Sequence, residues 1–344
     1  MKQLAIFIIA FLICHDGLFS QGRPELFPED LDENSLAIKC YCKPGVRNKS
    51  RPKGIEISYQ FLGNGEITAP NGEFGAPYPE YSKFRNFKAK LAFPIIRKEQ
   101  FTTIIGASYS AEQFELSSMA NDFQSLIGGT NNVNFKSTAI ELGGYYSINE
   151  KNYIGGKFIS SFNGSYDGIV KFDNRYAVYT GALLYGIKKD DDNEWGFGLA
   201  GSKNFRSQGF TILPYLFWNK TFDESWGMQI TFPTSYKLRY NLDNKTNIWA
   251  TANYNGESYS YDQAMGNSRS IAFNHAEILT RLKVEREIVP WLWMEFNIGY
   301  HFNFNSNFEL QSTNESLLDV DPGNSHFIKI GVFISPPDTF LNKH

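Results

Sequence analysis

Residues of alternating polarity make up much of this chain, and the alternation predicts β-strands. The clearest stretch is 292–305, where every second side chain faces the same side of an extended backbone. One face carries Leu292, Met294, Phe296, Ile298, Tyr300, Phe302 and Phe304, and the other carries Trp293, Glu295, Asn297, Gly299, His301, Asn303 and Asn305. Such a run is longer than ordinary strands of about 5–6 residues. It predicts a long strand with one face against lipid.

A repeated unit organises these strands. Six times a short polar turn precedes an alternating run, at 97–100, 149–152, 188–194, 223–225, 243–247 and 289–290. The residues that follow these turns are Phe101, Tyr153, Trp195, Trp226, the pair Ile248 and Trp249, and Trp291. Longer connections rich in Gly, Asn and Ser alternate with the turns. Short turns at one end, long loops at the other and aromatic residues at strand ends are typical of a transmembrane β-barrel.

The pattern therefore predicts an all-β fold, a closed antiparallel transmembrane β-barrel of about fourteen strands. They are expected at 54–62, 83–96, 101–111, 135–148, 153–163, 174–187, 195–204, 209–222, 226–232, 235–241, 247–256, 270–288, 291–305 and 324–335. If the two segments beside Pro233 lie outside the wall, twelve strands remain. Pro214 lies inside a predicted strand and predicts a local break or bulge, because proline removes a ladder hydrogen bond.

A soluble β-sandwich would also alternate. The aromatic fraction of 16%, with 30 Phe and 19 Tyr, and the length of the runs favour the membrane barrel instead. No stretch reaches the ~18 apolar residues that a spanning helix needs. A membrane protein without such helices is expected to be a closed barrel, since lipid cannot satisfy open strand edges.

The N-terminus predicts export. Residues 1–20 read as a signal peptide, with Lys2 before the apolar residues 4–14 and cleavage after Ser20. We expect residues 21–53 to be a periplasmic N-terminal segment, 54–335 the outer-membrane β-barrel of a Gram-negative bacterium, and 336–344 a C-terminal tail. The expected partners are outer-membrane lipid and, during insertion, the barrel-assembly machinery.

Charge and cysteine content restrict the chemistry. A net charge of −3 argues against a nucleic-acid partner. Cys40 and Cys42 alone supply too few ligands for a zinc site, so no metal or other cofactor is expected, and the two thiols are either free or joined in a disulfide. His275 and His301 are the imidazoles within the predicted barrel that could act in catalysis, and no serine pairs with either in a recognised pattern. The sequence therefore predicts no enzyme and no catalytic residue.

Charged side chains on the polar face of the strands are candidates for lining the lumen. They are Glu56, Lys88, Lys90, Glu141, Lys157, Lys237, Arg239, Glu277, Arg281, Lys283, Glu285, Glu295 and Lys329. Pairing between strands would let these charges fill the lumen, whereas unpaired bases in excess would line a pore with a slight anion preference. We expect Glu295 to face a base near the turn at 289–290, because a like-charged neighbour is costly.

Several stretches resemble a known family of barrels. They are residues 87–94, 213–222 with the turn into Trp226, 232–233 and 237–240. Over residues 54–335 the chain resembles a family of Bacteroidota-type outer-membrane β-barrels that carries only a domain-of-unknown-function label. The resemblance implies a fold and a location, but no catalytic or binding residues. The last strand departs from the usual barrel ending, because Ser335 to His344 follow it.

The sequence thus predicts an outer-membrane barrel of unknown specific role, a passive pore or a binder of small solutes. The alternative is a structural or surface-interaction barrel with a filled lumen and no transport. A continuous lumen would favour the pore, and a lumen closed by paired charges would favour the structural alternative.

Overall fold

The computed structural model describes residues 41–48, 51–63, 65–68, 80–117, 132–204, 211–262 and 270–335. These residues belong to one compact unit that spans Cys40–His344. The predicted signal peptide, residues 21–40 of the predicted N-terminal segment and the C-terminal tail lie outside the described residues. The assignments made for them remain predictions.

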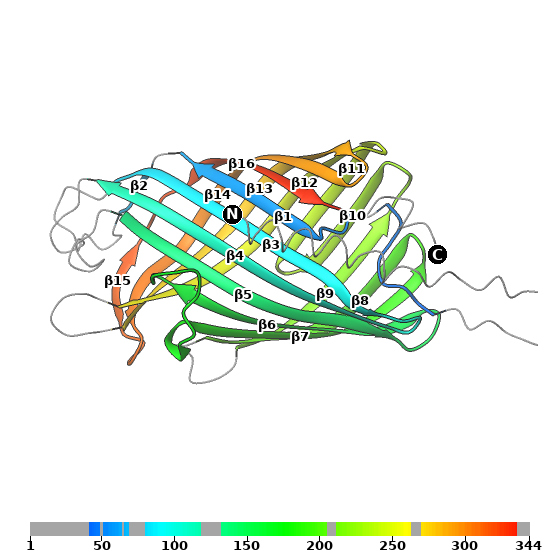
Figure 1. The fold of residues 1–344 in the computed structure, drawn as a ribbon, viewed down its shortest axis with the longest axis horizontal. Helices are drawn as coiled ribbons and strands as arrows, with labels where there is room; N and C mark the ends of the chain where they lie inside the picture. Colours follow the sequence, from blue (N-terminus) through cyan, green and yellow to red (C-terminus); the bar gives the residue numbers. More distant parts are fainter. Residues whose placement is uncertain are drawn as a thin grey trace, which may run out of the picture. The chain divides into compact units, whose positions relative to one another are not determined.

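Fourteen antiparallel strands of the described chain form a closed barrel (Figure 1). They are β1 (Ile55–Leu62), β3 (Glu80–Arg97), β4 (Phe101–Ser117), β5 (Asn132–Ser147), β6 (Asn152–Gly164), β7 (Ala177–Asp190), β8 (Asn193–Asn204), β9 (Thr211–Thr221), β10 (Trp226–Phe232), β11 (Ser235–Asp243), β12 (Thr246–Asp262), β13 (Ser270–Val289), β14 (Leu292–Leu310) and β16 (Ser325–Ile334). The ring closes because β1 pairs with both β16 and β3. The fold class and strand number predicted from the sequence are confirmed.

Three short elements extend this barrel at the end that carries the long loops. Strand β2 (Gly65–Glu66) pairs with β3, and β15 (Ser316–Val320) pairs with β14. A 3-10 turn, η1 (Asn174–Tyr176), lies between β6 and β7. Within the part of the chain that the structure describes, no helix is long and apolar enough to span a membrane. We call this end the loop end, and the opposite end, with the short connections, the turn end.

The wall has an apolar outer face and a mostly polar inner face, as the alternation predicts. On β14, Phe296 and Ile298 are 43% and 45% exposed, whereas Glu295 is 1% exposed and Asn297 is fully buried. Exposed apolar side chains recur on the other strands, for example Ile140 on β5. Such an outer surface suits the hydrocarbon layer of a membrane.

The predicted alternation is wrong at one residue, Asn305. The register between β13 and β14 shifts at Ala276 and Glu277, so that Phe304 is skipped in the pairing. Phe304 and Asn305 are therefore both exposed, and Ser306 turns back to the buried side. A β-bulge of this kind cannot be read from polarity, because the sequence continues to alternate through it.

Pro214 is the second correction, because it causes no bulge. The pairing of β8 with β9 runs through Leu199 and Pro214 without a shift. On the other side of β9, the pairing with β10 ends at Leu216 and Phe232. Pro214 thus lies beyond the end of β10, where β9 has one paired edge, and a proline is tolerated at such a position.

The hairpin of β10 and β11 belongs to the wall, which settles the strand number at fourteen and not twelve. It is nevertheless short. Pairing between β11 and β12 ends at Ser235 and Asn253, while β12 continues to Asp262 in contact with β13.

Candidate functional site

The described part of the predicted N-terminal segment, residues 41–48 and 51–53, follows the inner rim of the turn end. We call it the rim segment. Its hydrogen bonds reach four successive turns: Cys42, Arg47, Asn48 and Arg51 donate to backbone oxygens of Asn149, Asp191, Glu224 and Asn244 in that order. The segment therefore passes along the turns between β5 and β12 before it enters β1.

Buried inner-wall side chains hold the rim segment. The Gly45 N–H donates to Glu194 Oε2 at 2.6 Å, and the Ser147 hydroxyl donates to the Cys42 carbonyl. Ser147 is fully buried and Glu194 is 2% exposed. Because these partners are withdrawn from water, the bonds should contribute more than exposed ones would.

A cluster of six charged side chains lies where the rim segment joins β1. It consists of Lys53, Glu56, Lys283, Glu285, Glu295 and Lys329, and we call it the turn-end ion cluster. Glu285 and Glu295 lie directly opposite each other on β13 and β14, an arrangement that repels unless a cation intervenes. Lys53 Nζ provides this charge, 2.6 Å from Glu295 Oε2 and 3.4 Å from Glu285 Oε1.

Glu295 has basic neighbours, as predicted, but they come from the rim segment and from β16 and not from the hairpin of β13 and β14. Its second base is Lys329 on β16, with Nζ 2.9 Å from Oε1, while Lys283 pairs with Glu285 at 2.7 Å. Lys329 also lies 3.5 Å from Glu56. Burial alone would lower the pKa of Lys53, but the carboxylates of Glu295, Glu285 and Glu56 outweigh it and raise that pKa above its ordinary value.

Three further predicted lumen charges form a separate group. Glu141 on β5 accepts Lys90 from β3 and Lys157 from β6, each at 2.7 Å. The group is partly exposed. It links three of the four strands from β3 to β6 by charge pairing, and its Lys90 lies opposite Glu56 of the turn-end ion cluster in the pairing of β1 with β3.

The remaining predicted lumen residues lie at several places along the inner wall, from the rim segment to the cavity described below. Arg281 donates to Thr251 Oγ1 at 3.1 Å, and Arg239 is buried beside the rim segment, donating to the Arg47 carbonyl at 3.5 Å. Lys237 lies beside Thr251 in the register of β11 and β12, and Lys88 lines the cavity described below.

Large side chains fill the turn-end half of the lumen. Trp249, Trp293 and Phe333 are each 1% exposed, as are Glu285 and Glu295. The indole N–H of Trp249 donates to Glu285 at 3.0 Å, which ties the aromatic packing to the ion cluster. These buried side chains of β12, β13, β14 and β16 therefore pack the part of the lumen around the ion cluster.

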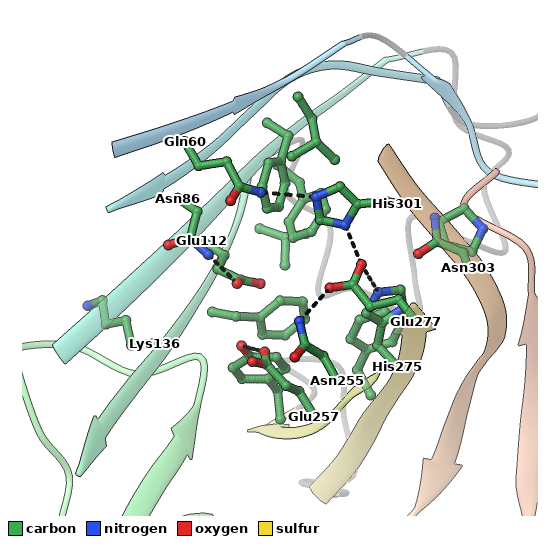
Figure 2. A pocket seen from close by; sticks show the side chains of 18 of the residues that line it. Gln60, Asn86, Glu112, Lys136, Asn255, Glu257, His275, Glu277, His301 and Asn303 are labelled. Atoms are coloured by element: carbon green, nitrogen blue, oxygen red, sulfur yellow. Dashed lines mark hydrogen bonds and ion pairs between the residues drawn. The ribbon is translucent and has the colours of Figure 1, made fainter. Parts of the chain in front are cut away.

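The loop-end half holds a cavity of about 900 Å³ (Figure 2). Polar side chains gather on part of its surface: Gln60, Asn86, Glu112, Asn255, Glu257, His275, Glu277 and His301. Aromatic side chains form much of the rest: Phe84, Phe114, Phe135, Tyr259, Phe273 and Phe308. Glu277 and Arg281 are predicted lumen residues that the structure brings to this cavity, as are Lys88 and Lys329.

Glu277 is the centre of the polar surface (Figure 2). It accepts a short hydrogen bond from the His301 ring and one from Asn255 Nδ2 at 3.1 Å. His275 Nε2 lies 3.4 Å from the same carboxylate, and Gln60 bonds the other nitrogen of His301 at 3.1 Å. This network connects β1, β12, β13 and β14 across the lumen.

Two more carboxylates of the cavity were outside the predicted strands. Glu112 accepts from Asn86 Nδ2 at 2.5 Å, and Glu257 accepts from the Tyr259 hydroxyl. They follow the ends of the strands predicted at 101–111 and 247–256. Strands β4 and β12 extend further than predicted, because polar residues on both faces near the loop end hide the alternation. The bases Lys53 and Lys136 were missed for other reasons: Lys53 lies in the N-terminal segment, and Lys136, inside the predicted strand 135–148, was not among the predicted lumen residues.

The aromatic surface comes from several strands. Phe135 on β5 stacks on Tyr259 of β12 with ring centroids 4.8 Å apart and on Phe273 of β13 at 5.3 Å. Phe308 on β14 lies 4.9 Å from Phe273. Offset and tilted rings at these distances are favourable, and they give the cavity a rigid apolar wall.

One contact resembles part of a catalytic triad. His275 Nδ1 lies 2.7 Å from Ser306 Oγ and its Nε2 lies 3.4 Å from Glu277 Oε2, a contact that no recognised sequence pattern indicated. The bulge at Phe304 brings Ser306 to this position. Ser306 is only 3% exposed, and the cavity lining includes His275 but not Ser306. A hydroxyl so placed is not accessible to a substrate in the cavity.

Several solved structures match this chain at low sequence identity. An outer membrane channel from Pseudomonas putida F1 is 10% identical, covers 85% of this chain and 99% of its own, and has a TM-score of 0.43. A FadL homologue from Pseudomonas aeruginosa is 10% identical over 81% and 89%, with a TM-score of 0.39. The Pseudomonas putida toluene transporter TodX is 8% identical over 83% and 89%, with a TM-score of 0.36. These values are too low to transfer a function.

The sequence comparisons give a family but no function. No protein of curated function matches the chain. The family described as Domain of unknown function (DUF6268) matches residues 86–335, which include thirteen of the fourteen barrel strands wholly or in part. The Bacteroidota-type origin remains a prediction. Because the match covers most of its length, the chain belongs to the DUF6268 family of unknown function.

Proposed function

We propose that this chain is an outer-membrane barrel that binds small amphiphilic solutes in its cavity and holds no permanently open pore. The apolar outer face of the wall supports the location, together with the predicted signal peptide. Fractionation of cells should recover the protein in the outer membrane, with heat-modifiable migration on a gel. A soluble protein without that shift would contradict the location.

The single observation that supports binding is the divided surface of the cavity. Its volume of about 900 Å³ is within the range of small-molecule sites, roughly 300–1,000 Å³. Stacked rings around Phe135 offer an apolar wall, and the network around Glu277 offers hydrogen-bond donors and acceptors. A solute with an aromatic or aliphatic body and one polar group would fit both surfaces.

This proposal differs from the passive pore with a slight anion preference, which was one of the alternatives left open by the sequence. Lys90, Lys157, Lys283 and Lys329 are four of the predicted bases, and each is in an ion pair with a glutamate. Paired bases do not form the free ring of charge that selects anions.

The packed turn-end half favours the second candidate, a structural barrel with a filled lumen. The cavity in the loop-end half is what distinguishes the two, since a purely structural barrel has no need to keep it. We propose no catalytic role, because Ser306 lies outside the cavity lining. The polar contacts of His275 and His301 serve instead to satisfy Glu277.

The test is equilibrium binding of 1-aminoanthracene, a fluorescent aromatic amine, to the protein in lipid nanodiscs. We expect saturable fluorescence enhancement beyond that of empty nanodiscs. Val133→Trp should reduce the affinity at least tenfold, because Val133 lines the cavity. Ile140→Trp on the same strand faces outward, 54% exposed, and should bind as the wild type does. Non-saturable signal, or equal binding by both variants, would favour the structural barrel.

A further inference from the structure

The short hairpin of β10 and β11 leaves a notch in the barrel wall. Strand β10 has 7 residues and β11 has 9, between β9 with 11 and β12 with 17. Residues 211–215 of β9 have no partner on β10, and residues 254–262 of β12 have none on β11. Among the described residues, the wall is thus interrupted between β9 and β12 above the turn at Pro233 and Thr234.

The notch begins within the height of the membrane. Seven residues at about 3.3 Å each span ~23 Å along the strand. With a tilt of about 40°, this corresponds to ~18 Å along the membrane normal, less than the ~25 Å apolar band of such barrels. Trp226 and Tyr240 lie at the turn end of the hairpin with tilted rings 4.7 Å apart, where an interface girdle is expected. The tip at Thr234 therefore lies below the upper limit of the hydrocarbon layer.

The two edges of the notch, on β9 and β12, limit their unpaired backbone groups within the membrane in different ways. Pro214, on β9, has no N–H to leave unpaired, and residues 211–214 are all exposed. At the base, the Tyr254 N–H of β12 donates to the Thr234 carbonyl at 2.9 Å. Unpaired strand edges at membrane depth are tolerated where they border a cavity and not where they face lipid alone.

The cavity extends to this notch. Its lining includes Thr234, Ser235 and Asn253 at the tip of the hairpin, and also Tyr254. Tyr254 belongs to the outer face of β12, where it is 48% exposed and its ring lies 5.9 Å from that of Phe304, an outward residue of β14. Tyr254 thus borders the cavity while its side chain lies on the outer surface, so the cavity reaches the β12 edge of the notch.

The opening is bounded above as well as below. The end of β6 crosses to β12, where Gly164 pairs with Ser260 and the Ser165 N–H donates to the Ser260 carbonyl at 2.9 Å. The six residue steps from Tyr254 to Ser260 correspond to roughly 20 Å along β12. The notch is therefore a window in the wall and not simply a low part of the rim.

We propose that solutes dissolved in the membrane enter and leave the cavity sideways, through this window between β9 and β12. The inference rests on the proposed function and names its substrate class: amphiphiles that partition into the lipid layer. The exposed apolar side chains Ile212 and Leu216 on β9, 67% and 56% exposed, provide a lipid-facing approach to the window.

Blocking the window after folding tests the route. Thr234→Cys, in a background with Cys40→Ser and Cys42→Ser, is labelled in nanodiscs with the bulky reagent 4-(N-maleimido)benzophenone. Stopped-flow mixing with vesicles that carry 1-aminoanthracene then measures how fast the probe reaches the cavity. We expect the label to slow both filling and release at least tenfold, because a blocked route lowers both rates, whereas a lost contact with the bound probe would speed release.

The matched control is Ala107→Cys, an exposed outer-face residue of β4, with the same label and background. It should fill and release the probe at the unlabelled rate. Unchanged rates in labelled Thr234→Cys, with saturable binding intact, would overturn the window and assign access to the loop end. Absence of saturable binding in the unmodified protein would instead overturn the proposed function itself.

Discussion

Glu285 and Glu295 form an unfavourable pair of carboxylates in the wall, and a lysine of the rim segment stabilises this pair. They lie opposite each other at the base of a hairpin, and each is 1% exposed. A third residue, Lys53, brings its ammonium group to both carboxylates although it is more than two hundred positions away in sequence. The charges of the turn end therefore depend on the rim segment for their balance.

Replacing that lysine should destabilise the barrel. In Lys53→Met, Glu285 and Glu295 keep Lys283 and Lys329 but lose the cation between them. We expect the free energy of unfolding, measured in urea, to fall by about 1–3 kcal/mol, because a buried charged group is left unsatisfied. The double variant Lys53→Met with Glu295→Gln should regain part of this loss. Equal stability of Lys53→Met and the wild type would show that the cluster is solvated.

The two faces of β14 give a second prediction. Phe296→Arg should place a charge in lipid and cost about 2–4 kcal/mol near the middle of the membrane. The control is Asn303→Arg on the same strand, because Asn303 lines the cavity and the new side chain has room there. Asn297 would be a poor control, since it is fully buried. Equal losses in both variants, measured by urea unfolding in vesicles, would contradict the assignment of the faces.

At the scale of elements, the strands were predictable and the rim segment was not. Alternation over stretches such as 292–304 fixes which face is apolar, and the aromatic residue after each turn marks a strand start. The rim segment has no such period. Its position depends on hydrogen bonds to turns far apart in sequence, such as that from Gly45 to Glu194. The strand ends were also underestimated, so Glu112 and Glu257 were assigned to loops.

The thiol of Cys42 reports on whether the rim segment is held. Cys42 is 2% exposed, and burial raises the pKa of its thiol. In a Cys40→Ser background, the reaction with N-ethylmaleimide should stay slow even at pH 8.5, where an ordinary thiol is about half thiolate. The rate should rise only above that pH, because the thiolate is the reacting form.

Variants of two neighbouring acids separate a held segment from a loose one. Glu194→Ala removes the buried acceptor of Gly45 and should speed the reaction of Cys42 at least tenfold. Asp192→Ala removes the exposed partner of Arg47 and should have little effect, since exposed ion pairs contribute little. A fast reaction in the unaltered protein would mean that the rim segment leaves the wall freely.

At the scale of the molecule, the barrel is packed around the turn-end ion cluster and holds a cavity toward the loop end. The wall of fourteen strands follows from the sequence, whereas the contents of the lumen do not. Inner-face residues such as Trp249, Glu285 and Phe135 have similar places in the alternation. Whether they close the lumen or border a cavity depends on which side chains meet across the barrel. Contacts between strands that are far apart in the sequence decide this. Contacts with the rim segment, which lies outside the repeated unit of turn and strand, decide it as well.

The central claim is that the turn end is closed in the resting protein, and planar-bilayer conductance tests it most directly. The wild-type protein should show no steady current above that of the empty bilayer at neutral pH. Lys53→Met combined with Arg51→Ala, which loosens the contacts to Glu295 and Trp293, should produce measurable openings. A stable, wide-pore conductance of the wild-type protein would contradict the account.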